Sequence, residues 1–129
     1  MKMHHVGLWV KDLEKQREFY EKFFDVFSGK LYVNKSRGFR SYFLYFDSGA
    51  AIEIMHQETL AESSHSYQEA GHLAIDMAVA ERVDLLTDKI RAAGYRIVSE
   101  PRITGDGYYE SVVADPEGNL IELVADPGR

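Results

Sequence analysis

Hydrophobic and polar residues alternate at the start of the chain, and this alternation predicts a β-strand. In the stretch HHVGLWV (4–10), one face carries Val6, Leu8 and Val10, and the other carries His5, Gly7 and Trp9. The next segment, 11–25, repeats its apolar residues at helical spacing and has Asp12 in a position to cap the first turn. We therefore expect a strand followed by a helix.

The rest of the chain predicts short strands, two hairpins and one more helix. We expect a short strand within 28–39 and a hairpin over 40–56 that turns at DSGA. The polar tract 57–71 is typical of a linker. After it, we expect a strand over 72–79, a helix over 81–94, a strand over 95–99 and a hairpin over 108–124 that turns at DPEGN.

The predicted elements follow the same order twice, which indicates an internal repeat. Strand, helix, strand and hairpin occur in residues 1–56 and again in residues 72–125, on either side of the linker. HVGLWV aligns with HLAIDM, and FDSGAAIEIM aligns with ADPEGNLIELV. The sequence therefore predicts a single α+β domain made of two βαβββ modules, each with its helix on one side of the sheet.

Both copies have a histidine at the start of the first strand and a glutamate in the middle of the last one. His5 precedes Glu53 by 48 residues, and His72 precedes Glu122 by 50 residues. Because branched aliphatic residues flank each glutamate, both carboxylates should point away from the helix. One histidine or glutamate on a strand is usually an ordinary polar residue, but two matching pairs in a repeat predict a common site.

A divalent cation is the partner that this group of side chains suits best. Two buried carboxylates are costly unless a positive charge compensates them. We therefore predict one divalent metal ion (Ni, Zn, Co or Mn) with four protein ligands, which are His5, Glu53, His72 and Glu122. In a six-coordinate shell two positions stay open for water or substrate, so the ion would polarise a carbonyl or stabilise an enediolate.

Three further residues are predicted to bind substrate beside the first His–Glu pair. If DSGA is a four-residue turn, Arg40 and Tyr42 share the face of Glu53, and Trp9 shares the face of His5. Arg40 would hold a substrate carboxylate. The basic stretch 30–40 would suit an anionic substrate, although it also fits an ordinary solvated loop.

The second copy offers polar neighbours for its own pair. The same alignment places Tyr108, Glu110 and Val112 on the face of Glu122. Candidate hydrogen-bond partners for a ligating imidazole are Asp76 and Glu110. The other histidines, His4, His56 and His65, are expected at the surface.

Composition and charge narrow the remaining classes. With 129 residues, of which 45% are hydrophobic and 12% aromatic, the chain has the composition of one globular domain. No stretch is apolar for long enough to cross a membrane, and the net charge of −6 argues against a nucleic-acid partner. Without cysteine, disulfides and thiolate chemistry are excluded. We therefore expect a soluble, cytoplasmic protein that acts on a small molecule.

From about residue 3 to residue 125, the chain resembles the vicinal oxygen chelate superfamily, also called the glyoxalase/bleomycin-resistance/dioxygenase group. The resemblance lies in HHVGLWVKDLEKQREFYEKFF, FDSGAAIEIM, GHLAIDM and DPEGNLIELV, and it is strongest to small glyoxalase I-type (lactoylglutathione lyase) proteins. It implies two βαβββ modules that form an open, cupped sheet around one divalent metal, with His, Glu, His and Glu as ligands in chain order. These ligands correspond to His5, Glu53, His72 and Glu122.

The resemblance also implies a reaction. In glyoxalase I-type enzymes the substrate is the hemithioacetal of glutathione and methylglyoxal, and the product is S-lactoylglutathione. A glutamate ligand moves a proton between neighbouring carbons while the metal stabilises the enediolate. Glu122 and Glu53 are both candidates for this base, and we favour Glu122. A different thiol or α-hydroxycarbonyl adduct is the alternative substrate.

Other activities of this superfamily stay open at this point. They include thiol transfer to fosfomycin, epimerisation, ring-cleaving dioxygenation and non-catalytic drug binding of the bleomycin-resistance type. The intact ligand set favours an enzyme. Exposed sheet edges and an apolar flank predict a homodimer, and in related glyoxalases the two modules that share a metal can come from different subunits.

Overall fold

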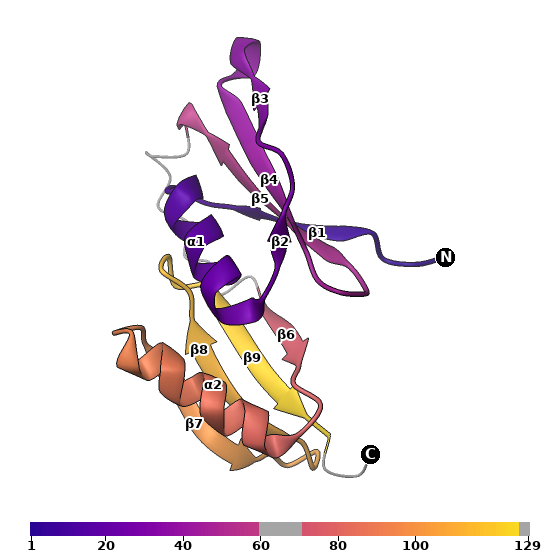
Figure 1. The fold of residues 1–129 in the computed structure, drawn as a ribbon, viewed down its shortest axis with the longest axis vertical. Coiled ribbons are helices and arrows are strands. Elements are labelled where there is room, and N and C mark those ends of the chain that lie inside the picture. Colours follow the sequence, from indigo (N-terminus) through magenta and orange to yellow (C-terminus); the bar gives the residue numbers. More distant parts are fainter. Residues whose placement is uncertain (60–70, 127–129) are drawn as a thin grey trace. The chain divides into compact units, whose positions relative to one another are not determined.

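The computed structural model describes residues 1–59 and 71–126. The chain divides into two compact units, Met1–His65 and Ser66–Arg129 (Figure 1). Residues 60–70 of the predicted linker lie outside the described residues, and so does His65. Neither helix of the described residues is long and apolar enough to cross a membrane.

The first unit contains one α-helix and a five-stranded sheet. Its elements are β1 (His5–Trp9), α1 (Leu13–Phe24), β2 (Phe27–Ser28), β3 (Tyr32–Asn34), the 3₁₀ turn η1 (Lys35–Arg37), β4 (Phe39–Tyr45) and β5 (Ala51–Gln57). The strand order is β1-β5-β4-β2, and β3 also pairs with β4. β1 runs parallel to β5, whereas β4 is antiparallel to its partners.

The second unit repeats this arrangement with a four-stranded sheet. Its elements are β6 (His72–Asp76), α2 (Ala80–Ala92), β7 (Ile97–Ile103), β8 (Tyr109–Ala114) and β9 (Leu120–Ala125). The strand order is β6-β9-β8-β7, with β6 parallel to β9 and the other pairs antiparallel. α2 lies along one face of this sheet (Figure 1). The predicted α+β fold with a repeated unit is confirmed.

The repeat extends from the order of elements to the packing of each helix. The buried residues of α2 are Val83, Leu86, Thr87 and Ile90. Each follows a buried residue of α1 by 67 positions, in the order Gln16, Phe19, Tyr20 and Phe23. Strand residues of the same unit form the other side of each core; among them Leu44 and Ile54 in the first unit and Val113 and Ile121 in the second are fully buried. Each sheet therefore has one face committed to its helix.

The strand predicted over 95–99 runs instead from Ile97 to Ile103 and passes through Pro101. Proline has no N–H group for the sheet, but β7 is an edge strand, where this loss is tolerated. Its pairing with β8 also changes register between Ser99 and Arg102. The proline lies in this irregular stretch and does not end the strand.

The β4–β5 hairpin shows that the predicted face of Arg40 and Tyr42 is wrong. The loop between the strands has five residues, 46–50, and places Phe43 opposite Glu53. A four-residue turn would have shifted the pairing by one residue, and such a shift exchanges the two faces of a strand. Arg40 and Tyr42 therefore lie on the helix-facing side, opposite His56 and Ile54.

The contacts of Tyr42 explain what this side chain does there. Its hydroxyl donates to Glu14 Oε1 on α1 at 2.6 Å, and the Arg17 guanidinium lies 5.4 Å from its ring centre. The hydrogen bond lowers the pKa of the Glu14 carboxyl and raises the pKa of the Tyr42 hydroxyl. Tyr42 thus joins β4 to α1.

We expect Tyr42→Phe to weaken this junction without changing any metal site. The substitution removes the hydroxyl and keeps the ring, so the free energy of unfolding should fall by about 0.5–1 kcal/mol. Urea denaturation and a titration with Ni²⁺ measure the two effects. If the variant instead keeps its stability and binds nickel less tightly, Tyr42 lies on the face of Glu53, and the strand register described above is contradicted.

In the second unit, we expect Thr87→Val to lower the free energy of unfolding by about 1–3 kcal/mol. Thr87 Oγ1 donates to the Val83 carbonyl at 2.6 Å and lies 2.7 Å from Ser111 Oγ, and both side chains are fully buried. Valine keeps the shape of Thr87 but leaves the Ser111 hydroxyl without this partner. The double variant with Ser111→Ala should recover part of the loss in denaturation experiments, whereas strictly additive losses would contradict this coupling.

Candidate metal site

His5 and Glu53 lie on neighbouring parallel strands of the first unit. β1 pairs with β5 so that Gly7 is beside Glu53, and His5 is on the same face, two residues earlier. His5 Nε2 is 3.5 Å from Glu53 Oε1, and the glutamate side chain is 17% exposed. The flanking Ile52 and Ile54 are buried. Glu53 therefore points away from the helix, as the aliphatic flanks predict.

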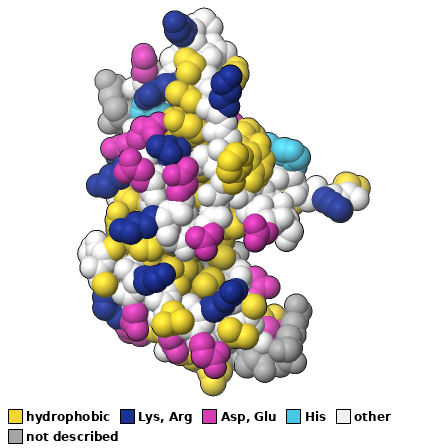
Figure 2. All heavy atoms as spheres, in the orientation of Figure 1, with side chains coloured by type: hydrophobic (Ala, Val, Ile, Leu, Met, Phe, Trp, Pro, Cys, Tyr) yellow, Lys and Arg dark blue, Asp and Glu magenta, His cyan; other side chains and the backbone are white. Residues whose placement is uncertain are grey.

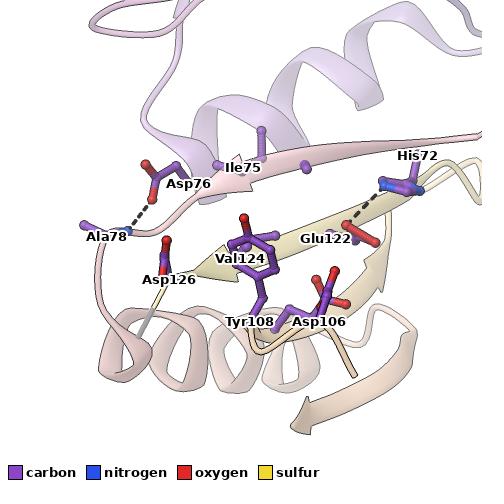
Figure 3. A pocket seen from close by; sticks show the side chains of 11 residues that line it. His72, Ile75, Asp76, Ala78, Asp106, Tyr108, Glu122, Val124 and Asp126 are labelled. Carbon is purple, nitrogen blue, oxygen red and sulfur yellow. Dashed lines mark hydrogen bonds and ion pairs between the residues drawn. The ribbon is translucent and has the colours of Figure 1, made fainter. Parts of the chain in front are cut away.

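His72 and Glu122 form the same arrangement in the second unit. β6 places Ala74 beside Glu122, with His72 two residues earlier on that face. His72 Nε2 is 3.1 Å from Glu122 Oε2, and the glutamate side chain is 21% exposed (Figure 3). Ile121 and Leu123 on either side are fully buried. Each unit therefore brings one predicted imidazole and one predicted carboxylate together.

The N···O distances in these pairs suit two ligands of one cation. When nitrogen and oxygen each bind a metal at about 2.1 Å, they lie roughly 3.0 Å apart at an octahedral angle and 3.4 Å at a tetrahedral one. The two measured distances lie close to these values. They also suit a hydrogen bond between imidazole and carboxylate, so the spacing fits a metal without requiring one.

The described residues show pairs and no larger cluster. Within 1–59 and 71–126, no group of three or more His, Asp or Glu side chains is arranged to hold an ion, and the chain has no cysteine. A four-ligand site made of both pairs thus stays a prediction.

Aromatic rings lie on the same sheet face as the first pair. The His5 ring lies 5.0 Å from the ring of Phe43, which is opposite Glu53 in the hairpin. Trp9 lies on the face of His5, as predicted, and its ring contacts that of Phe39 at 6.0 Å. If the loop had been predicted with five residues, Phe43 and Phe39 would have taken the place of Arg40 and Tyr42 on this face. The sequence signal for the five-residue loop is the match between Gly49 and Gly118, each of which lies four residues before the glutamate of its unit.

The second pair borders a cavity of about 700 Å³ whose lining is rich in carboxylates (Figure 3). Besides Glu122, the acidic lining residues are Asp76, Asp106, Glu110 and Asp126. The described lining residues include no Lys or Arg, and Tyr108 adds a hydroxyl.

Two of these acidic residues were predicted neighbours of the pair. Val112 is opposite Glu122, and Glu110 is opposite Val124, so the predicted face of Glu110 is confirmed. Burial, together with the nearby Glu122 carboxylate, raises the pKa of Glu110, although Arg102 Nη2 lies 3.9 Å from Glu110 Oε1. Asp76 accepts the Ala78 N–H at 2.8 Å. Its carboxylate therefore supports the turn before α2.

Two histidines expected only at the surface make defined contacts. His56 is half-buried, and its Nδ1 donates to the Val10 carbonyl at 2.9 Å. His4 is exposed, but its Nδ1 lies 2.8 Å from Nδ1 of His5. Strand alternation alone places His4 on the opposite face from His5, and the contact is possible because His4 precedes the first residue of β1.

Known proteins resemble this chain in sequence and in fold. An uncharacterized protein of Bacillus subtilis, YqjT, is 32% identical over 128 residues, which cover 95% of this chain and 98% of YqjT. Glyoxalase I from Zea mays has a TM-score of 0.78 and 22% identity over 95% of this chain. This chain spans only 44% of the maize protein.

A second solved structure matches over most of both chains. The trypanothione-dependent glyoxalase I of Leishmania major has a TM-score of 0.79 and 23% identity, and the match covers 99% of this chain and 88% of that protein. At these identities the structural matches establish the fold alone. The family model of the glyoxalase/bleomycin resistance protein/dioxygenase superfamily matches residues 2–123. With this match over nearly the whole chain, we conclude that the protein belongs to the glyoxalase/bleomycin resistance protein/dioxygenase superfamily.

Proposed function

We propose that this protein is a metal-dependent, glyoxalase I-like lyase or isomerase that moves a proton between neighbouring carbons of a small α-hydroxycarbonyl adduct. The observation that carries the proposal is the duplicated His–Glu pair, which has ligand-like N···O distances in both units. Repetition matters because a single pair would be an ordinary polar contact.

The ligands in this proposal are His5, Glu53, His72 and Glu122, which together hold one Ni, Zn, Co or Mn ion. They come from one chain or from two chains of a homodimer. A bound divalent cation supplies positive charge that stabilises a developing oxyanion. The glutamate side chains are mostly buried, at 17% and 21% exposure, so charge compensation would stabilise the folded units as well.

Glu122 is the proposed proton carrier. Its carboxylate lines the cavity of the second unit, so a substrate in this cavity would be within its reach. Glu122 takes the proton from the hemithioacetal carbon, whose C–H electron pair forms a carbon–carbon double bond while the carbonyl π pair moves to the oxygen. Glu122 then returns the proton to the adjacent carbon, and the hydroxyl proton of the hemithioacetal moves to the other oxygen, which leaves a thioester next to a hydroxyl-bearing carbon. Glu53 is the alternative carrier, and its surroundings are aromatic.

The cavity favours a hemithioacetal whose thiol part carries no net negative charge. Its acidic lining residues repel an anionic adduct such as that of glutathione and attract a cationic one. Arg40, which was predicted to hold a substrate carboxylate, lies on the helix-facing side of β4. We therefore propose a neutral or cationic adduct ahead of the glutathione adduct.

The same carboxylates support a second candidate function. A cavity of about 700 Å³ has the size of a drug-binding site, and its acidic lining would suit a cationic small molecule. A non-catalytic binding protein of this kind would bind such molecules without a metal. Turnover and metal content therefore distinguish the two functions.

The ligand assignment predicts how metal affinity responds to substitution. His72→Ala and Glu122→Gln should each weaken Ni²⁺ binding by more than about 100-fold, because each removes a direct ligand rather than an outer contact. Isothermal titration measures the affinity, and circular dichroism should show an unchanged fold. Glu110→Gln is the matched control, since it makes the same change in the same cavity. Equal losses in all three variants would contradict the assignment.

The cavity charge predicts which adducts are turned over. With methylglyoxal and a restored metal, kcat/KM should be higher for the cysteamine hemithioacetal, which is cationic, than for that of glutathione. Removing one carboxylate with Glu110→Gln should narrow this ratio, because it weakens the repulsion of the anionic adduct. A preference for the glutathione adduct that Glu110→Gln leaves unchanged would contradict the charge argument. If no metal supports turnover, the non-catalytic binding function is favoured instead.

A further inference from the structure

We propose that His4 is a positioning residue for the first His–Glu pair, because it can accept the Nδ1–H of His5 and so leave the Nε2 lone pair of His5 available for a cation beside Glu53. The inference rests on the proposed function in one respect, namely that His5 is a ligand. Nothing in the sequence alignment of the two modules assigns a role to His4.

Both ring nitrogens of His5 have defined neighbours. Nδ1 lies 2.8 Å from Nδ1 of His4, and Nε2 lies 3.5 Å from Glu53 Oε1. The His4 and His5 rings meet edge to face, with centres 5.1 Å apart and an interplanar angle of 82°. Phe43 contacts both rings, at 6.3 Å from His4 and 5.0 Å from His5. The orientation of His5 is therefore defined on three sides.

The position of His4 is also defined by its backbone. Its carbonyl oxygen accepts the N–H of Ala51, the first residue of β5, at 3.0 Å. This bond attaches the residue before β1 to the strand that carries Glu53. Figure 2 shows histidine side chains next to a group of hydrophobic side chains close to the N-terminal residues. His4 is exposed to solvent, yet its backbone is held beside the pair.

Proton counting gives this contact a direction. A neutral imidazole has one N–H, and it binds a metal only through the nitrogen without a proton. If Nε2 of His5 is the ligand, its proton is on Nδ1 and is donated to His4, whose own proton is then on Nε2. The reverse hydrogen bond, donated by His4, leaves the proton of His5 on Nε2 and blocks ligation.

In the second unit, the residue that precedes the histidine cannot make this contact. The alignment that matches His5 with His72 matches His4 with Gly71, which has no side chain. The two pairs are thus alike in their ligands and different in the residue that precedes the histidine. An effect of His4 should therefore be confined to His5 and leave His72 unchanged.

The test compares His4→Phe with His4→Asn. Phenylalanine keeps the ring beside Phe43 and removes the acceptor, whereas the Oδ1 atom of asparagine replaces Nδ1 as an acceptor. Long-range ¹H–¹⁵N spectra of the zinc-loaded protein report the Nδ1–H group of each ligating histidine. We expect a downfield, slowly exchanging Nδ1–H resonance of His5 in the wild type and in His4→Asn, an upfield shift of this resonance in His4→Phe, and no change at His72.

Metal affinity is the second readout. Outer contacts to ligating histidines typically change metal affinity by 10–100-fold, so His4→Phe should weaken Ni²⁺ binding by about this factor and His4→Asn should restore most of it. The inference is overturned if the Nδ1–H resonance of His5 is the same in His4→Phe as in the wild type, or if His4→Phe binds nickel as the wild type does. A wild type that binds no metal would contradict the ligand role of His5 and the metal-dependent function, whereas metal binding that His4→Phe leaves unchanged would contradict this inference alone.

Discussion

The candidate site depends on the strict alternation of side chains along two strands, β5 and β9. In each strand, aliphatic residues on both sides of a glutamate are buried against the helix, so the carboxylate must project from the opposite face. The parallel neighbour, β1 or β6, then brings a histidine to the same face. A one-residue change of register in either strand would bury the glutamate and expose the aliphatic residues. The energy of the core therefore defines the position of the polar pair.

The repeat made much of this arrangement predictable. Matching histidines and glutamates, together with their aliphatic flanks, were sufficient to predict the two pairs and the face on which each carboxylate lies. The face of Arg40 and Tyr42 could not be obtained in this way, because it depends on the length of one loop. The contact between His4 and His5 was also missed, since alternation holds only inside the strand. At turns and strand ends, the local sequence pattern determines the direction of a side chain less strictly than it does inside a strand.

The two units share a His–Glu pair and differ in the side chains beside it. Aromatic rings, including that of Phe43, lie beside the first pair, whereas carboxylates such as Glu110 line the cavity beside the second. Burial and the Glu122 carboxylate raise the pKa of Glu110, because a negative charge is less stable in this setting than in water. A cation, from a metal or from a substrate, would relieve this cost. The His–Glu pair is thus the feature that the two units share, and the side chains beside it are where they differ in charge.

The central claim is that the two His–Glu pairs hold one divalent ion. X-ray absorption of the nickel-loaded protein tests it most directly, because multiple scattering from imidazole rings reports the number of histidine ligands. The account predicts one nickel ion for every two His–Glu pairs, with two imidazole ligands and oxygen ligands at about 2.1 Å. A spectrum with one imidazole or none, or one that is unchanged when His5 and His72 are both replaced by alanine, would contradict it.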